Sequence, residues 1–213
     1  MTCDGFSVRG RHLCEDFGLC IADRSLSVPA QKRATVSIPF SHGEIDFSAI
    51  NGEVYYESRE LAYSIDLIAD DPAELESQVS EVAQWLAPVC NDDIAEDSMP
   101  GYHWRASAAS VGVSRDDSGT AATVEAKFSA YPFALADEEC EARIAVGTNP
   151  VVNRGSMRAR ISIVPDGTVT LTVGNLKQTF NGPTATNLYL APGDNEVEVS
   201  GGSALIRWRE GIL

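Results

Sequence analysis

Cysteine and histidine, the side chains that most often do chemistry, are few in this sequence and widely spaced. Zinc and redox motifs need close C-x-x-C pairs that bring two sulfur atoms to one ion or one disulfide, and the sequence has no such pair. In a reducing compartment isolated cysteines are mostly small, buried or half-buried thiols, and we predict this role for all five. They are Cys3, Cys14, Cys20, Cys90 and Cys140.

The three histidines, His12, His42 and His103, lie far apart, and none belongs to an H-E-x-x-H or H-x-H motif. The Gly-x-Ser-x-Gly elbow of hydrolases is absent, and so are the glycine-rich loops that bind phosphate. A histidine could still meet a cysteine in the fold, but nothing in the sequence favours such a pair. We therefore predict no catalytic, cofactor-binding or metal-binding residue, and a protein that is not an enzyme.

An acidic stretch, N-D-D at 91–93 with E-D at 96–97, offers oxygen ligands of the kind that calcium binds. It lacks the D-x-[DN]-x-[DN]-G spacing and the glycine in the middle of the loop, so we expect a solvated loop after a helix. Asp116-Asp117 is typical of a hairpin turn.

Two aromatic residues near the end of the chain, Tyr189 and Trp208, could stack on a sugar ring. Trp208 lies on the apolar side of its predicted strand, which favours a role in the core. A monomeric carbohydrate-binding β-sandwich module is nevertheless the main alternative function, and an enzyme with an unrecognised site is a third.

The formal charge is −15 at pH 7, from 16 Lys and Arg against 31 Asp and Glu, and it is unevenly distributed. Residues 1–145 carry a net charge of −16 and residues 146–213 a net charge of +1. A negative domain repels phosphate, which argues against specific nucleic-acid binding. There is no long apolar run, so we expect no membrane insertion.

The end of the chain has the pattern of an antiparallel sandwich, with short alternating stretches between turn residues such as Pro165-Asp166-Gly167. The front is mixed. We predict a long strand at 54–68 after the Asn51-Gly52 turn, a helix that Asp71 caps and that ends before Pro88, and a strand pair at 102–113 and 123–130. Residues 139–150 are the best candidate boundary, and we find no internal repeat.

The order of several motifs resembles that of the distal tail proteins of long, flexible-tailed bacteriophages. The motifs span nearly the whole chain: F-S-V-R-G-R-H at 6–12, E-D-F-G-L at 15–19, H-G-E-I-D-F at 42–47, Y-Y-E-S-R-E-L at 55–61, P-G-Y-H-W-R at 100–105, F-S-A-Y-P-F at 128–133 and L-A-P-G-D-N at 190–195. One departure is that the family's G-R-D-G loop reads F-S-H-G at 40–43.

The resemblance implies a mainly β fold. Residues 1–145 would form an N-terminal β-sandwich ring (belt) domain with one α-helix, and residues 146–213 a small C-terminal galectin-like β-sandwich. Arg207 and Arg209 of the second domain would face outward and suit acidic partners. We predict that this domain stays monomeric when expressed alone, whereas residues 1–145 still assemble.

The resemblance also implies a structural role in the virion, at the phage tail tip, after synthesis and assembly in the cytoplasm of the bacterial host. A homo-hexameric ring would join the tail tube protein to the tail-tip or tail-associated protein. The C-terminal sandwiches would brace the ring or carry receptor-binding parts. DNA would pass through the channel without specific binding, and no cofactor would be needed.

Overall fold

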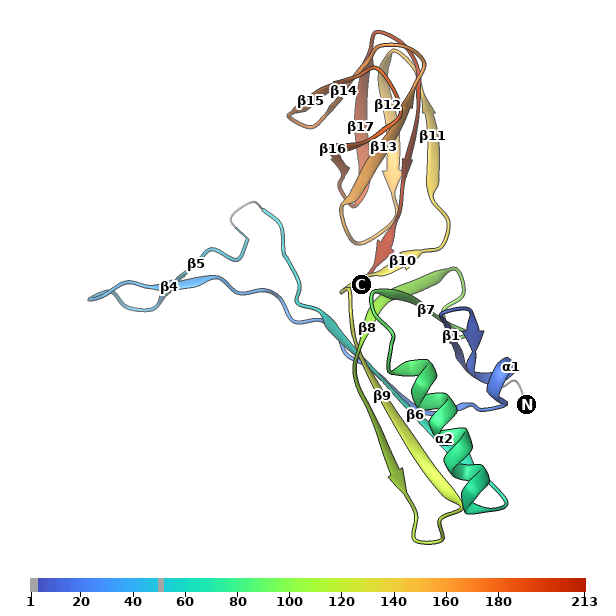
Figure 1. The fold of residues 1–213 in the computed structure, drawn as a ribbon. Helices are drawn as coiled ribbons and strands as arrows, with labels where there is room; N and C mark the ends of the chain where they lie inside the picture. Colours follow the sequence, from blue (N-terminus) through green and yellow to red (C-terminus); the bar gives the residue numbers. More distant parts are fainter. Residues whose placement is uncertain (1–3, 50–51) are drawn as a thin grey trace. The chain divides into compact units, whose positions relative to one another are not determined.

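The computed structural model describes residues 4–49 and 52–213, which form two compact units (Figure 1). The N-terminal unit comprises Met1–Pro100 and Trp104–Pro132, and the C-terminal unit comprises Gly101–His103 and Phe133–Leu213. The boundary expected after residue 145 therefore falls inside the C-terminal unit. The physical reason is that the strand at Cys140–Ile144 pairs with the strand at Ala204–Trp208 and so belongs to the second sheet system.

The fold is mainly β, as predicted. The elements from the start of the chain to residue 130 are β1 (Phe6–Val8), β2 (Arg11–His12), α1 (Leu13–Phe17), β3 (Ile21–Leu26), β4 (Thr35–Ser37), β5 (Glu44–Asp46), β6 (Arg59–Ile68), α2 (Pro72–Leu86), β7 (Asp92–Glu96), β8 (Tyr102–Arg115) and β9 (Ala121–Ala130). The short helix α1 is an addition to the one helix that was expected.

The N-terminal unit is built on an antiparallel sheet in the order β2-β1-β7-β8-β9-β6-β3. The inward residues predicted for β6, namely Leu61, Tyr63, Ile65 and Leu67, are all buried. They lie beside the buried alternate residues of β9, and α2 contacts both strands. One face of the sheet and the helix therefore share a core.

Helix α2 begins and ends where the sequence predicted. The side chain of Asp71 accepts hydrogen bonds from the backbone amides of Ala73 and Glu74 at 2.8 and 2.9 Å, and Pro72 occupies the first turn, where its missing N–H costs nothing. The predicted apolar stripe, Leu75, Val79, Val82 and Leu86, is buried.

Two predictions for the N-terminal unit are wrong. The strand expected at 54–68 begins only at Arg59, because the residues before it have no continuous partner strand: Val54 and Tyr55 are exposed, and Tyr56 forms an isolated bridge with Gln31. The turn predicted at Asn51-Gly52 lies partly outside the described residues. The acidic stretch at 91–97 is not a solvated loop, since most of it is β7, which pairs with both β1 and β8.

The C-terminal unit contains two four-stranded antiparallel sheets, in the orders β11-β18-β13-β16 and β12-β17-β14-β15. Apolar residues that alternate along the strands of both sheets make one core, as expected for a sandwich. Its elements are β10 (Ala134–Ala136), β11 (Cys140–Ile144), β12 (Gly147–Asn153), β13 (Ala159–Pro165), β14 (Val169–Val173), β15 (Leu176–Phe180), β16 (Thr184–Leu190), β17 (Gly193–Ser200), β18 (Ala204–Trp208) and β19 (Gly211–Ile212).

A local motif, A-x-G-x-N, occurs twice in this unit, although the sequence analysis found no internal repeat. One copy runs from the end of β11 to Asn149 in β12, and the other from the end of β16 to Asn195 in β17, so both copies join one sheet to the other. Each Asn side chain accepts a hydrogen bond from the amide four residues earlier and donates one to the carbonyl of that residue. These distances are 3.0 and 2.7 Å for Asn149, and 2.8 and 2.8 Å for Asn195.

We expect Asn195→Ala to lower the free energy of unfolding of the full chain by about 1–2 kcal/mol, because backbone groups of the crossing lose their partner. Denaturant unfolding followed by circular dichroism measures the change. Asn175→Ala, in an exposed turn, is the matched control and should change stability by less than about 0.5 kcal/mol. Equal effects of the two substitutions would contradict a structural role for the motif.

Candidate assembly surfaces

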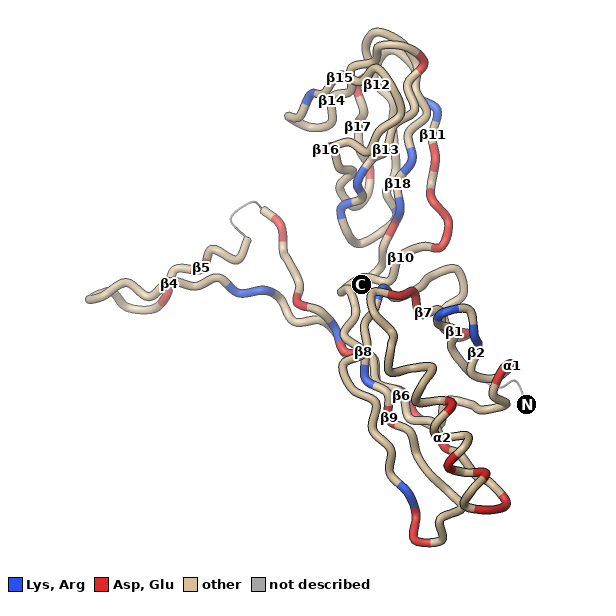
Figure 2. The backbone as a smooth tube through the Cα atoms, in the orientation of Figure 1, with Lys and Arg blue, Asp and Glu red and all other residues tan. Residues whose placement is uncertain are grey.

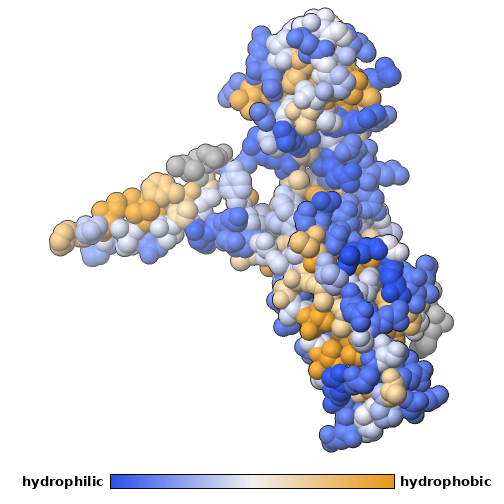
Figure 3. Space-filling view, viewed as in Figure 1, coloured by the Kyte–Doolittle hydropathy of each residue, from blue (hydrophilic) through white to orange (hydrophobic). Residues whose placement is uncertain are grey.

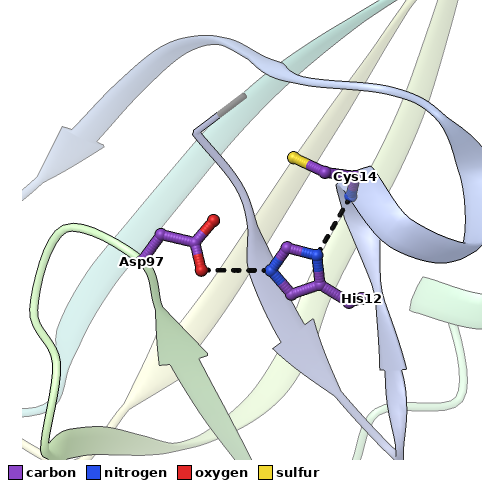
Figure 4. A group of neighbouring side chains, drawn as sticks. All are labelled: His12, Cys14 and Asp97. Carbon is purple, nitrogen blue, oxygen red and sulfur yellow. Dashed lines mark hydrogen bonds and ion pairs between the residues drawn. The ribbon is translucent and has the colours of Figure 1, made fainter. Parts of the chain in front are cut away.

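Three side chains with metal-binding atoms meet at the start of α1: His12, Cys14 and Asp97 (Figure 4). Their ligand atoms lie within 4.8 Å of one another. Each is already engaged, however. His12 Nδ1 accepts from the amides of Cys14 and Glu15 at 3.2 and 3.4 Å, its Nε2 lies 3.1 Å from Asp97 Oδ1, and the sulfur of Cys14 is in a disulfide. We interpret the group as the N-cap of α1, tied to the end of β7.

The expectation that all cysteines are thiols is wrong for Cys14 and Cys20, which are disulfide-bonded. The fold brings their sulfur atoms to a partner without any C-x-x-C spacing, so the motif search missed them. Cys90 is an exposed free cysteine and Cys140 a partly buried one, and Cys3 lies outside the described residues.

Burial raises the pKa of the Cys140 thiol, and the nearby carboxylate of Glu210 raises it further. Because the thiolate is the reactive form, we expect iodoacetamide at pH 7.5 to alkylate Cys90 at least about tenfold faster than Cys140. Peptide mass spectrometry over time measures both rates. In urea the two rates should converge, and similar rates in the folded protein would contradict the prediction.

The remaining histidines do not join a common site in the described part of the chain. His42 is exposed in the turn between β4 and β5. His103 is buried at the start of β8, with Nδ1 at 2.6 Å from the carboxylate of Asp137, so it holds β8 beside β10 within the C-terminal unit.

The main surface feature of the N-terminal unit is an arm, residues 27–58, which leaves the sheet after β3 and returns to it at β6 (Figure 1). Its outer part is the antiparallel β4–β5 pair, in which Val36 lies opposite Ile45. Its two limbs are joined nearer the sheet by backbone hydrogen bonds of 2.8 Å from Lys32 to Tyr55 and from Glu57 to Ala30.

The arm exposes apolar side chains on both limbs, and Figure 3 shows them as orange atoms over the β4–β5 pair. The exposed large residues are Val28, Val36, Ile38, Phe40, Ile45, Phe47, Val54 and Tyr55. Phe40 is fully exposed and has a φ of +66°, a left-handed conformation that costs a bulky residue about 1–3 kcal/mol. An exposed apolar surface of this kind marks an interaction site.

The two ends of the arm where it joins the sheet are called its roots. Both are held by a buried polar network around Glu96, which is 4% exposed. One carboxylate oxygen accepts from the hydroxyl of Tyr63 at 2.7 Å and from the indole of Trp104 at 3.2 Å. The other accepts from Arg24 of β3 at 2.9 Å. Burial and the charge of Glu96 raise the pKa of Tyr63, which therefore stays a neutral donor.

Arg59 extends this network at the returning root. Its guanidinium lies 4.2 Å from the ring centroid of Trp104, and it donates to the carbonyls of Ser27 at 2.9 Å and Pro132 at 3.3 Å. Burial lowers the pKa of Arg59, and the negative charge of Glu96 opposes that effect. Arg24, Arg59, Tyr63, Glu96 and Trp104 are called the root network below. Sequence reasoning missed it, because its members come from four strands.

In the C-terminal unit the two aromatic residues that could stack on a sugar ring, Tyr189 and Trp208, lie in different environments. Trp208 is buried in the core, as predicted. Tyr189 is partly exposed, with the guanidinium of Arg158 at 5.4 Å from its ring centroid. A groove of about 520 Å³ lies on the other sheet and is lined by residues of β12, β14 and β17, most of them polar, and by Gly174, with no aromatic residue. A stacking side chain and a groove thus do not coincide in the described residues.

The two arginines that were expected to face outward, Arg207 and Arg209, have different surroundings. Arg207 is exposed, and its Nε lies 3.4 Å from Glu141. Arg209 follows β18, its side chain is 37% exposed, and it donates to the carbonyls of Ala136 and Asp137 at 3.0 and 3.2 Å. Its guanidinium is therefore partly engaged by the segment 136–139 of the same unit.

No family model matches the sequence, and no curated protein matches it. Solved structures do match. The Dit (gp 19.1) protein of phage SPP1, described as a paradigm of the hub adsorption apparatus in phages that infect Gram-positive bacteria, gives a TM-score of 0.75 at 13% identity over 99% of both chains. A chain of the phage P2 baseplate in its activated conformation with Ca gives 0.44 at 6% identity, over 97% of this chain and 98% of that one.

The second score is too low to establish a shared fold, whereas the first, over the whole of both chains, does. No helix among the described residues is long and apolar enough to cross a membrane. Over its whole length this chain has the fold of the Dit hub protein of phage SPP1.

Proposed function

We propose that this chain is a structural distal tail protein of a long-tailed bacteriophage or prophage. Six copies would form a ring that joins the tail tube to the tail tip or baseplate. The observation that carries the proposal is the likeness of the whole chain to SPP1 Dit, at a TM-score of 0.75. At 13% identity this likeness gives the fold, and the function follows from it by analogy.

The arm supports self-assembly. A closed ring needs two different, complementary surfaces on each copy. The arm supplies one, since its apolar side chains are exposed in the described chain and its roots are fixed by the root network. Its partner in this proposal is the N-terminal unit of a second copy.

The charge distribution suits passage of DNA. Six copies of a region with a net charge of −16 would surround the channel with negative potential, which disfavours binding to phosphates. DNA would then move through without specific contacts. The direct neighbours would be the tail tube protein and the tail-tip protein, with the C-terminal sandwiches carrying or bracing receptor-binding parts. The proposed role is structural, in the virion, after assembly in the host cytoplasm.

Size-exclusion chromatography with light scattering tests the ring. We expect a mass of about six times the 22.8 kDa chain, and electron micrographs of purified protein with a central hole. A mass of one chain at all concentrations would contradict the proposal. It would favour the carbohydrate-binding module, whose remaining support is the partly exposed Tyr189.

A further inference from the structure

The charges of the C-terminal sandwich are segregated between its two sheets, although the residues from 146 onward carry a net charge of only +1. On β11, β13 and β18, exposed arginines alternate with buried apolar residues and so point away from the core. Figure 2 shows them as blue segments on these strands. This outer surface is called the basic face, and its arginines are Arg143, Arg160 and Arg207 of these strands together with Arg158, which directly precedes β13.

The outer surface of the other sheet carries the opposite charge. This surface, called the acidic face, presents Asp194, Glu196 and Glu198 of β17, the last two beside buried Val197 and Val199. These carboxylates lie opposite uncharged residues of β12 in the strand register. Lys177 of β15 is the one basic residue within the four strands of this sheet in the described chain.

The basic face has the composition of a protein interface. Exposed Val164 and partly exposed Tyr189 lie among the arginines, and the face has no lysine. Arginine and tyrosine are enriched at interfaces, whereas lysine is depleted. Glu141 is the single acid of this face in the described chain, and it is paired with Arg207. Arg143 is exposed and has no ion pair among the described residues.

We propose that the basic face of one copy docks on the acidic face of the C-terminal sandwich of the next copy around the ring. The inference rests on the proposed ring. Two faces of opposite sign on opposite sheets are the two different surfaces that a head-to-tail contact requires. A second copy is the one partner whose charge complementarity is seen in the structure.

The contact is weak by itself, because surface charge pairs contribute little and are screened by salt. We therefore expect isolated sandwiches to stay monomeric, which is also what the sequence analysis predicts. Within a ring held by the N-terminal units, neighbouring sandwiches meet at millimolar effective concentration, and a weak contact is then populated.

A cross-linking experiment on the full chain tests the contact. Arg160→Cys and Glu198→Cys are combined in a Cys90→Ser background and oxidised at low salt. We expect a ladder of covalent multimers on a denaturing, non-reducing gel, and no ladder beyond dimers from either single cysteine variant. An intact ring without a ladder would overturn the inference and leave the proposed function standing. A monomeric protein would instead overturn the proposed function itself.

Charge reversal identifies the partner face. The cross-linking variant is given one of two further changes: either Arg143→Glu together with Arg207→Glu, or Glu196→Arg alone. Either change should lower the initial cross-linking rate at least about tenfold, since like charges then meet. Reversing both faces in one chain should restore the rate to within about threefold. Lys177→Glu, which makes the acidic face more acidic, is the matched control and should not slow the reaction. Failure of the double reversal to restore the rate would show that the basic face serves a different partner and would overturn the inference.

Discussion

Replacing Glu96 by Ala will lower the free energy of unfolding of the N-terminal unit by about 3–5 kcal/mol. The carboxylate is 4% exposed and accepts hydrogen bonds from Tyr63, Trp104 and Arg24. Its removal leaves two buried neutral donors, Tyr63 and Trp104, without their acceptor and takes one ion pair from Arg24, which keeps its contacts with Asp4 and Ser98. Denaturant unfolding of the full chain, followed by the fluorescence of the buried tryptophans, measures the loss.

Two further variants separate the parts of the network. Glu96→Gln keeps the shape but removes the charge, and it should cost about half as much, because the amide still accepts one hydrogen bond. Glu125→Gln, on an exposed position of β9, is the matched control for a lost carboxylate and should change stability by less than about 0.5 kcal/mol. If Glu96→Ala were as mild as this control, the network would not hold the sheet together.

A second consequence concerns the arm. Arg24 precedes it and Arg59 follows it, and both belong to the root network. We therefore expect Glu96→Ala to increase the rate of limited proteolysis at the arm roots more than a destabilisation of the whole unit would.

The sequence analysis did not identify Glu96 as a buried residue, because an acid near Asp92 and Asp97 looks solvated. Glu96 is buried among partners that lie 72, 33 and 8 residues away along the chain, namely Arg24, Tyr63 and Trp104.

The parts of the fold that were predicted correctly depend on local signals. Asp71 and Pro72 fix the start of α2 by hydrogen bonds and φ restriction within one turn. Alternation along Leu61–Leu67 needs only a sheet with one buried side. Both signals are contained in fewer than 20 neighbouring residues, so the sequence alone is sufficient to recognise them.

The arm shows where such signals fail. Val54 and Tyr55 have the same β-forming character as the true strand β6 that follows, but alternation does not reveal whether a partner strand is present. The segregation of charge in the C-terminal sandwich could not be predicted from the sequence for a similar reason. Arg160 and Glu198 both point outward by parity, and only the strand order assigns them to opposite faces.

Phe40→Gly should weaken assembly of the ring at least about thirtyfold per interface without destabilising the monomer. A fully exposed aromatic ring has no packing to lose within its own chain, whereas a buried aromatic anchor at an interface contributes at least about 2 kcal/mol. Glycine also accommodates the φ of +66° without strain, so the substituted turn should be at least as stable as the native one. Light scattering over a dilution series measures assembly, and thermal unfolding measures stability.

Opposite signs of the two effects make this test specific. A variant that merely damages the fold loses stability and assembly together, whereas Phe40→Gly should keep or gain stability while it loses the ring. Leu176→Ser, which also removes an exposed apolar side chain but from the C-terminal unit, is the control and should leave the oligomer unchanged. An oligomer of Phe40→Gly as resistant to dilution as the native protein would show that the tip of the arm is not an anchor. The left-handed conformation of Phe40 would then have no counterpart in assembly, and the second copy would have to be bound by the other apolar residues of the arm.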